Sequence, residues 1–236
     1  MDFLRDILTN QIFLITWLIV DAASVGWLIH DLYTRNREIV GLMKFVWIFT
    51  VVYSGPIGLA VYYFSGRKQI KRDSLWRRGW RSDAHCYSGC GGGEIAGVFI
   101  AAGLLSLSNW WIAGITFAMA YVAGFGMTVG PLVQEGIPLK TALKDAFISE
   151  TASITVMEVT AIGVDLALAA EATIGDVLFW SSLIFSLSVG LFAAYPVNVL
   201  LIKLGVKEGM HDPRKMASHS HGRSDKSAES RREAFH

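Results

Sequence analysis

Residues 177–204, VLFWSSLIFSLSVGLFAAYPVNVLLIKL, decide the fold class of this 236-residue chain. The stretch contains a single charged side chain, Lys203, close to its end. A helix needs about 20 mostly apolar residues to cross the hydrocarbon core of a bilayer. The stretch is long enough to do so, which is typical of a membrane protein.

Five further apolar segments precede it, so the sequence predicts an all-α bundle with about six membrane-spanning helices. Their approximate bounds are 11–30, 39–64, 94–107, 110–131 and 151–170. Pro56, which follows Ser54 and Gly55, is expected to kink the second segment. Only Ser108 and Asn109 separate the third segment from the fourth, which predicts a tight antiparallel hairpin.

The composition supports a polytopic membrane protein that contacts the lipid bilayer. Hydrophobic residues make up 53% of the chain and charged residues only 17%, against about 25% charged in soluble domains. These values exclude an ordinary soluble enzyme, a disordered chain and a nucleic-acid-binding protein. Two cysteines are too few for a disulfide scaffold.

Two further segments lie outside the predicted spans, one between the fourth and fifth spans and one after the sixth. Residues 137–148 are too short to span and carry Lys140, Lys144 and Asp145, so an interfacial amphipathic helix is expected there. Residues 211–236 are polar and rich in Ser, Arg and Lys, which predicts a disordered cytoplasmic tail. Residues 1–210 are expected to form one transmembrane domain.

The positive charges predict the orientation, because cytoplasmic loops of membrane proteins are enriched in Lys and Arg. With six spans and both termini in the cytoplasm, 18 of the 21 Lys and Arg residues fall on the cytoplasmic side. Only Arg35, Arg37 and Lys44 fall on the opposite side. We therefore expect a prokaryotic cytoplasmic (inner) membrane protein with both termini inside.

The main chemical feature is HCYSGCGGGE, residues 85–94, which contains both cysteines of the chain. Thiolate, imidazole and carboxylate are the ligand types of copper, zinc and iron. The predicted metal ligands are His85, Cys86, Cys90 and Glu94. In a helix Cys86, Cys90 and Glu94 would share one face, although the four glycines favour a partial loop.

Two other interpretations of this motif stay open. A glycine loop before a helix N-terminus could bind a phosphate or another anion. Alternatively, Gly93 and Gly97 have the small-residue spacing that allows helices to pack closely in membranes, and the cysteines are then packing residues.

The motif resembles the signature His-Cys-x-x-Gly-Cys-x-x-Gly-Asp of an uncharacterised prokaryotic membrane family, domain of unknown function 4396. The resemblance extends over about 82–210. The other matching residues are Ala142, Leu143, Lys144, Ser149, Tyr195, Pro196, Asn198, Lys203, Gly205, Lys207 and Glu208. The chain departs from the pattern at Glu94, which replaces Asp, and at Asp145, which directly follows Lys144.

The resemblance implies a multi-pass membrane fold and no established activity. Members of the family are sometimes labelled copper oxidases, which makes copper the first candidate among the metals.

Acidic residues inside predicted spans are the second chemical feature, because a charge in the membrane is costly and usually faces a cavity or a partner. Asp21 lies in the first segment, Glu158 and Asp165 lie in the fifth, and Glu150 stands at the entrance of the fifth. Glu158 and Asp165 are seven residues apart and so share a helix face. They could line an ion path, or be protonated and bonded to neighbouring helices.

The sequence thus leads to three hypotheses. The first is metal handling or redox chemistry within a membrane complex, with any transported ion passing from the cysteines along the acids of the fifth span. The second is a structural or assembly subunit that associates with other membrane subunits or with itself. The third is a proton-coupled carrier. The sequence does not decide whether the protein is an enzyme.

Overall fold

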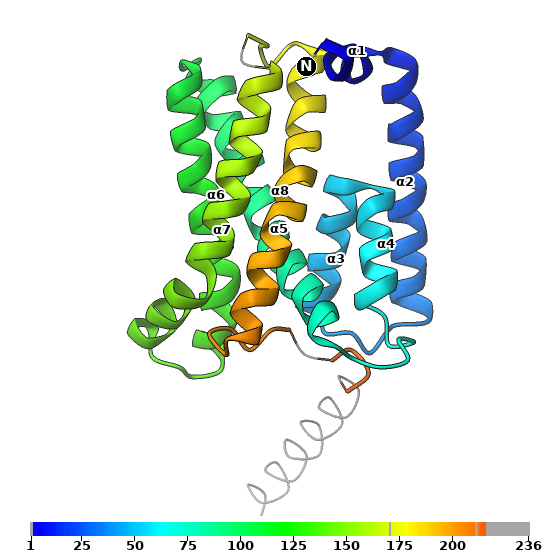
Figure 1. The fold of residues 1–236 in the computed structure, drawn as a ribbon, viewed down its shortest axis with the longest axis vertical. Helices are drawn as coiled ribbons and strands as arrows, with labels where there is room; N and C mark the ends of the chain where they lie inside the picture. Colours follow the sequence, from blue (N-terminus) through cyan, green and yellow to red (C-terminus); the bar gives the residue numbers. More distant parts are fainter. Residues whose placement is uncertain (1, 170, 211, 216–236) are drawn as a thin grey trace, which may run out of the picture.

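The computed structural model describes residues 2–169, 171–210 and 212–215, and within them the chain is helical without any strand (Figure 1). The elements are α1 (Asp2–Thr9), α2 (Gln11–Thr34), α3 (Gly41–Ser54), α4 (Pro56–Ser65), α5 (Leu75–Val98), the π-helix η1 (Phe99–Leu104), α6 (Asn109–Gln134), α7 (Leu139–Ala169) and α8 (Val177–Lys203). The predicted all-α class is confirmed. The predicted disordered tail lies almost entirely outside the described residues.

Four helices, α2, α6, α7 and α8, are long and apolar enough to cross a membrane. They contain the predicted spans 11–30 and 110–131, and nearly all of 151–170 and 177–204. Large apolar side chains on their outer surfaces are exposed, among them Ile12, Trp110, Val122 and Val159. Proteins in water rarely expose so extensive an apolar surface, so these surfaces face the lipid of a bilayer.

The prediction of a single span over 39–64 is wrong, because α3 and α4 form a hairpin of two short helices (Figure 1). Gly55 between them has φ +56° and ψ −130°, which glycine adopts without the strain of a Cβ. Pro56 is the first residue of α4, where its missing N–H costs no hydrogen bond. The rings of Trp47 and Tyr62 pack between the two helices with centroids 5.4 Å apart. The chain therefore turns back where a kink was expected.

Asp31, buried at the end of α2, holds the open end of this hairpin. Its carboxylate accepts hydrogen bonds from the Tyr62 hydroxyl at 2.8 Å and from the Asn36 amide at 2.8 Å. The Arg67 guanidinium donates to both carboxylate oxygens, at 2.8 and 3.0 Å. A bidentate pair of this kind fixes orientation as well as charge, so the ends of α2 and α4 lie at the same end of the bundle.

Two other predicted boundaries need correction. The expected interfacial helix 137–148 is not a separate helix but the beginning of α7, which continues without a break from Leu139 to Ala169. The expected span 94–107 is the second half of a longer element, α5 followed by η1, which begins at Leu75. The close packing of α5 against its neighbours outweighs the low helix propensity of its glycines.

The two described ends of the chain lie at opposite ends of the bundle, not on one side as predicted (Figure 1). Arg5 donates to the carbonyl oxygens of Leu168 and Ala167 at 2.8 and 3.0 Å, in the last turn of α7. Arg214 instead donates to the Lys71 carbonyl oxygen at 3.2 Å, beside the start of α5. The hairpin of α3 and α4 accounts for the difference, because it returns the chain to the side from which it came.

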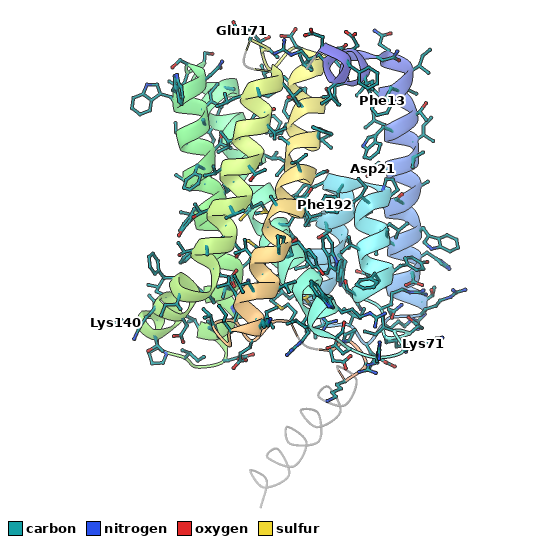
Figure 2. The ribbon with its side chains drawn as sticks, viewed as in Figure 1. Phe13, Asp21, Lys71, Lys140, Glu171 and Phe192 are labelled. Carbon is teal, nitrogen blue, oxygen red and sulfur yellow. The ribbon has the colours of Figure 1, made fainter. Side chains whose placement is uncertain are left out.

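This topology separates the charges sharply. The segments 35–44, 67–81, 140–144 and 203–215 lie at the end of the bundle opposite α1, and they contain every Lys and Arg of the described residues except Arg5 (Figure 2). We call it the basic end. The other end, which we call the α1 end, carries Glu171 and Asp176 in the turn before α8.

Candidate functional site

The central element of the bundle is α5, which packs against α3, α4, α6, α7 and α8. It is polar and rich in glycine, yet most of its residues from Gly79 to Val98 are buried. Ser74 caps its N-terminus by accepting a hydrogen bond from the Arg77 backbone N–H. The other helices shield α5 from lipid, so a helix of this composition is stable at the membrane centre.

Glycines on one face of α5 allow it to approach α6 closely. A Cβ on Gly93 would lie 2.4 Å from the Met119 carbonyl oxygen, and one on Gly97 would lie 2.7 Å from the Thr116 Cα. A Cβ on Gly89 would lie 3.1 Å from the Gly124 Cα. The close helix packing expected at Gly93 and Gly97 is therefore confirmed, whereas the partial loop, and with it the glycine loop for anions, is wrong because 75–98 are helical.

The two cysteines lie on one face of this helix and are both buried. Their Sγ atoms are 3.9 Å apart, and neither forms a disulfide. Gly124 of α6 makes room for the Cys90 thiol, because a Cβ at that position would lie 2.7 Å from the Cys90 Sγ. The backbone of the neighbouring helix thus accommodates a buried pair of thiols.

Two carboxylates lie next to this pair, one turn further along the bundle. Glu94 of α5 is 1% exposed and Glu158 of α7 is 0% exposed. Neither oxygen of Glu158 has a hydrogen-bond partner within the described residues, and Oε2 of Glu94 has none either. Cys90 is the side chain with which Glu158 interacts, although without good hydrogen-bond geometry, and Glu94 is within electrostatic reach of Glu158 and Asp165. We call Cys86, Cys90, Glu94 and Glu158 the thiol–carboxylate centre.

Asp165 continues this line of acids along α7. Its Oδ1 accepts a hydrogen bond of 2.6 Å from the Ser182 hydroxyl of α8. The three acids Glu94, Glu158 and Asp165 thus lie near one another, as the shared helix face of the last two predicted.

The structure places His85 toward a different group of side chains. It precedes Cys86 by one residue and so points about 100° away around the helix. Its electrostatic partners are Glu150 and Lys207, nearer the basic end. Within the described residues no three His, Cys, Asp or Glu side chains are grouped closely enough to hold a metal ion. The four-residue ligand set therefore stays a prediction.

Glu150 is not free to line an ion path, because Lys207 pairs with it. The Lys207 Nζ donates to Glu150 Oε2 at 2.6 Å and to Asn198 Oδ1 at 2.9 Å. The Asn198 amide in turn donates to Asp83 Oδ1 at 2.8 Å. All four side chains are buried, so this network ties α5, α7 and α8 together with the segment that follows α8.

Asp21 stands apart from these groups. It lies on α2 against the tip of the α3–α4 hairpin, with its Oδ1 3.1 Å from where a Cβ on Gly55 would be (Figure 2). Its Oδ1 has no hydrogen-bond partner within the described residues. No contact joins it to the other predicted acids.

Sequence reasoning missed several buried polar residues. Asp31 and Arg67 form a salt bridge of 2.8 Å, and Arg81 forms another of 2.8 Å with Asp73. Asp83 was also missed, although it stands only two residues before the motif. Lys207 and Asn198 were among the residues that match the family pattern, but the sequence assigned no role to them. Since partners such as Arg67 and Asp31 are far apart in the chain, spacing alone gives little sign of them.

These features define the class of protein: a multi-pass helical membrane protein whose central helix is polar, buried and rich in glycine. The family model described as "Domain of unknown function (DUF4396)" matches residues 75–207, from the start of α5 to the residue that pairs with Glu150. The chain belongs to this family, as the motif led us to expect. No curated protein and no solved structure matches it.

Proposed function

We propose that the protein binds a soft transition-metal cation inside the membrane bundle, with copper as the first candidate and zinc or iron as the others. The distance of 3.9 Å between the Sγ atoms of Cys86 and Cys90 carries the proposal. Two metal–sulfur bonds of about 2.3 Å at a tetrahedral angle hold their sulfur atoms about 3.8 Å apart. The thiols thus need little rearrangement to share one ion, and thiolates favour copper(I), zinc and iron.

The carboxylates of Glu94 and Glu158 support the proposal through their charge. A buried acid without a partner is costly in the membrane unless a proton or a cation neutralises it. A cation bound between the two thiols would lie beside Glu158 and would interact favourably with both acids. His85 completes the predicted ligand set only if its ring turns toward Cys86.

We infer that the function is metal handling in the membrane, at a prokaryotic cytoplasmic membrane. Positive charge on the cytoplasmic side puts the basic end in the cytoplasm and the α1 end outside. Association with other membrane subunits or with a second copy stays a prediction, as does a redox role for the bound ion.

The sidedness can be tested by cysteine labelling in intact cells, after both native cysteines are replaced by serine. Glu171 lies at the α1 end (Figure 2), Glu135 follows the end of α6 at the basic end (Figure 1), and both are exposed. A membrane-impermeant thiol reagent should label Glu171→Cys in intact cells and Glu135→Cys only after the membrane is opened. Labelling of both variants in intact cells would contradict the topology.

The metal proposal is tested by elemental analysis of the protein purified in detergent, before and after anaerobic loading with copper(I), zinc or iron(II). We expect about one ion per chain in the wild type and almost none in Cys86→Ser/Cys90→Ser. Cys86→Ser alone should retain an ion only weakly, because one thiolate remains.

The matched control is Gly92→Ala, a change on the same helix between Cys90 and Glu94. Its Cβ would meet only the Tyr53 hydroxyl, at 3.5 Å, so it should bind metal like the wild type. The melting temperature of each variant shows whether the bundle is intact. If no ion binds to the folded wild type after loading, the proposal is wrong and a structural role is favoured.

A further inference from the structure

A second feature of the bundle is a cavity of about 40 Å³ between α5, α6, α7 and α8. Glu94 of α5 lines its inner part, and Asp165 lines it about one turn before the end of α7. At its outer extreme are Asn109, the first residue of α6, and Ala172, in the turn after α7. The cavity thus runs from Glu94 in the bundle to the α1 end.

Buried polar atoms without partners face this cavity. Glu94 Oε2 and Thr116 Oγ1 have no hydrogen-bond partner within the described residues, and their side chains are 1% and 4% exposed. Both residues line the cavity. Because an unpaired buried polar atom costs free energy, such atoms are usually satisfied by water. About 10–15 Å³ suffices for one water molecule, so the cavity has room for a few.

The charges at its two extremes differ. The turn at the α1 end carries Glu171 and Asp176, and Arg5 is the only Lys or Arg of the described residues at that end. In the opposite direction the buried ammonium group of Lys207 lies beyond the centre, paired with Glu150. Acidic groups at an entrance raise the local concentration of cations, whereas Glu150 on the other side is neutralised by Lys207 and does not attract them.

We propose that this cavity is an aqueous access pathway by which water and small cations reach the thiol–carboxylate centre from the α1 end. The identity of the cation in this inference rests on the proposed function. The presence of water in the cavity does not. Thr116 and Asp165 line the pathway, and Glu94 stands where it meets the centre.

The pathway is tested by the accessibility of single cysteines on α6, in the Cys86→Ser/Cys90→Ser background. Ala113 lines the cavity, whereas Ala118 is exposed on the outer surface of the same helix. A small, charged, membrane-impermeant methanethiosulfonate reagent reacts with thiolates, which form only in contact with water. In proteoliposomes of known orientation, Ala113→Cys should react from the α1 side faster than Ala118→Cys, on the order of tenfold.

Three outcomes would overturn the pathway: equal rates for the two positions, reaction of Ala113→Cys only from the basic end, or no reaction at all in a variant that melts like its background. A further variant, Ala113→Trp, should slow the release of a bound ion to a chelator on the α1 side while the number of ions per chain is unchanged. Since the labelling experiment contains no metal, it fails independently of the metal proposal.

Discussion

Replacing Gly93 with alanine should destabilise the protein by about 3 kcal/mol, the upper part of the range for overpacking a tight core. The added Cβ would lie 2.4 Å from the Met119 carbonyl oxygen and 2.6 Å from the Ala120 Cα. Both are backbone atoms of α6, so no rotation of a side chain relieves the clash. The two helices must move apart, which also opens the thiol–carboxylate centre. The measurement is the thermal unfolding of the purified protein in detergent.

The matched control is Gly92→Ala, one position earlier on the same helix. Its Cβ would make only an ordinary contact, 3.5 Å from the Tyr53 hydroxyl. Alanine is more favourable than glycine in a helix by about 1 kcal/mol, so this variant should be as stable as the wild type or slightly more so. Equal melting temperatures for Gly92→Ala and Gly93→Ala would contradict the close approach of α5 to α6.

The loss of stability at Gly93 also bears on what sequence alone can predict about α5. The apolar segments α2, α6, α7 and α8 could be found because a helix that faces lipid needs a continuous apolar surface. Most of helix α5 from Gly79 to Val98 is buried among other helices, so its sequence is free to carry glycines and charges. Its glycines were interpreted in part as a loop, whereas in the bundle they are the positions where another helix comes closest.

The α3–α4 hairpin could not be distinguished from a span for the opposite reason. Residues 39–64 are apolar and long enough to cross a membrane, and hydropathy does not report the direction of the chain. The local signal was Gly55 before Pro56, which a kink and a reversal share. The position of Asp31 and Arg67 decides between them, since their bidentate pair joins the end of α2, before the hairpin, to the segment that follows α4.

For the candidate site, the sequence shows which residues share a helix face but not which partners they have. Cys86, Cys90 and Glu94 do share a face of α5, and Glu158 and Asp165 lie near that face. Glu150, an acidic residue at the start of the same predicted span, is instead neutralised by Lys207. Whether an acid has a counter-charge depends here on a contact between residues 57 positions apart. A short sequence motif cannot reveal such a contact.

Replacing Lys207 with methionine should therefore also be strongly destabilising, with a loss of about 3–5 kcal/mol. Glu150 and Lys207 are 3% and 6% exposed, and their charged atoms are 2.6 Å apart. Removal of the ammonium group leaves a buried carboxylate without its counter-charge, and leaves Asn198 Oδ1 with only the longer hydrogen bond of 3.4 Å from the Ser82 hydroxyl. The double variant Glu150→Gln/Lys207→Met should recover most of the loss, because it removes both charges together.

Lys203→Met is the matched control, since it removes the same charge from an exposed side chain on the last turn of α8. It should change the melting temperature little, as exposed charges contribute at most about 1 kcal/mol. If Lys207→Met melts like Lys203→Met, the ion pair does not hold the end of α8 against α7. If instead the double variant is no more stable than Lys207→Met, the loss comes from the packing of the lysine stem and not from the unpaired charge of Glu150. Recovery in the double variant would make this pair the structural boundary of the bundle at the basic end, distinct from the acids of the thiol–carboxylate centre.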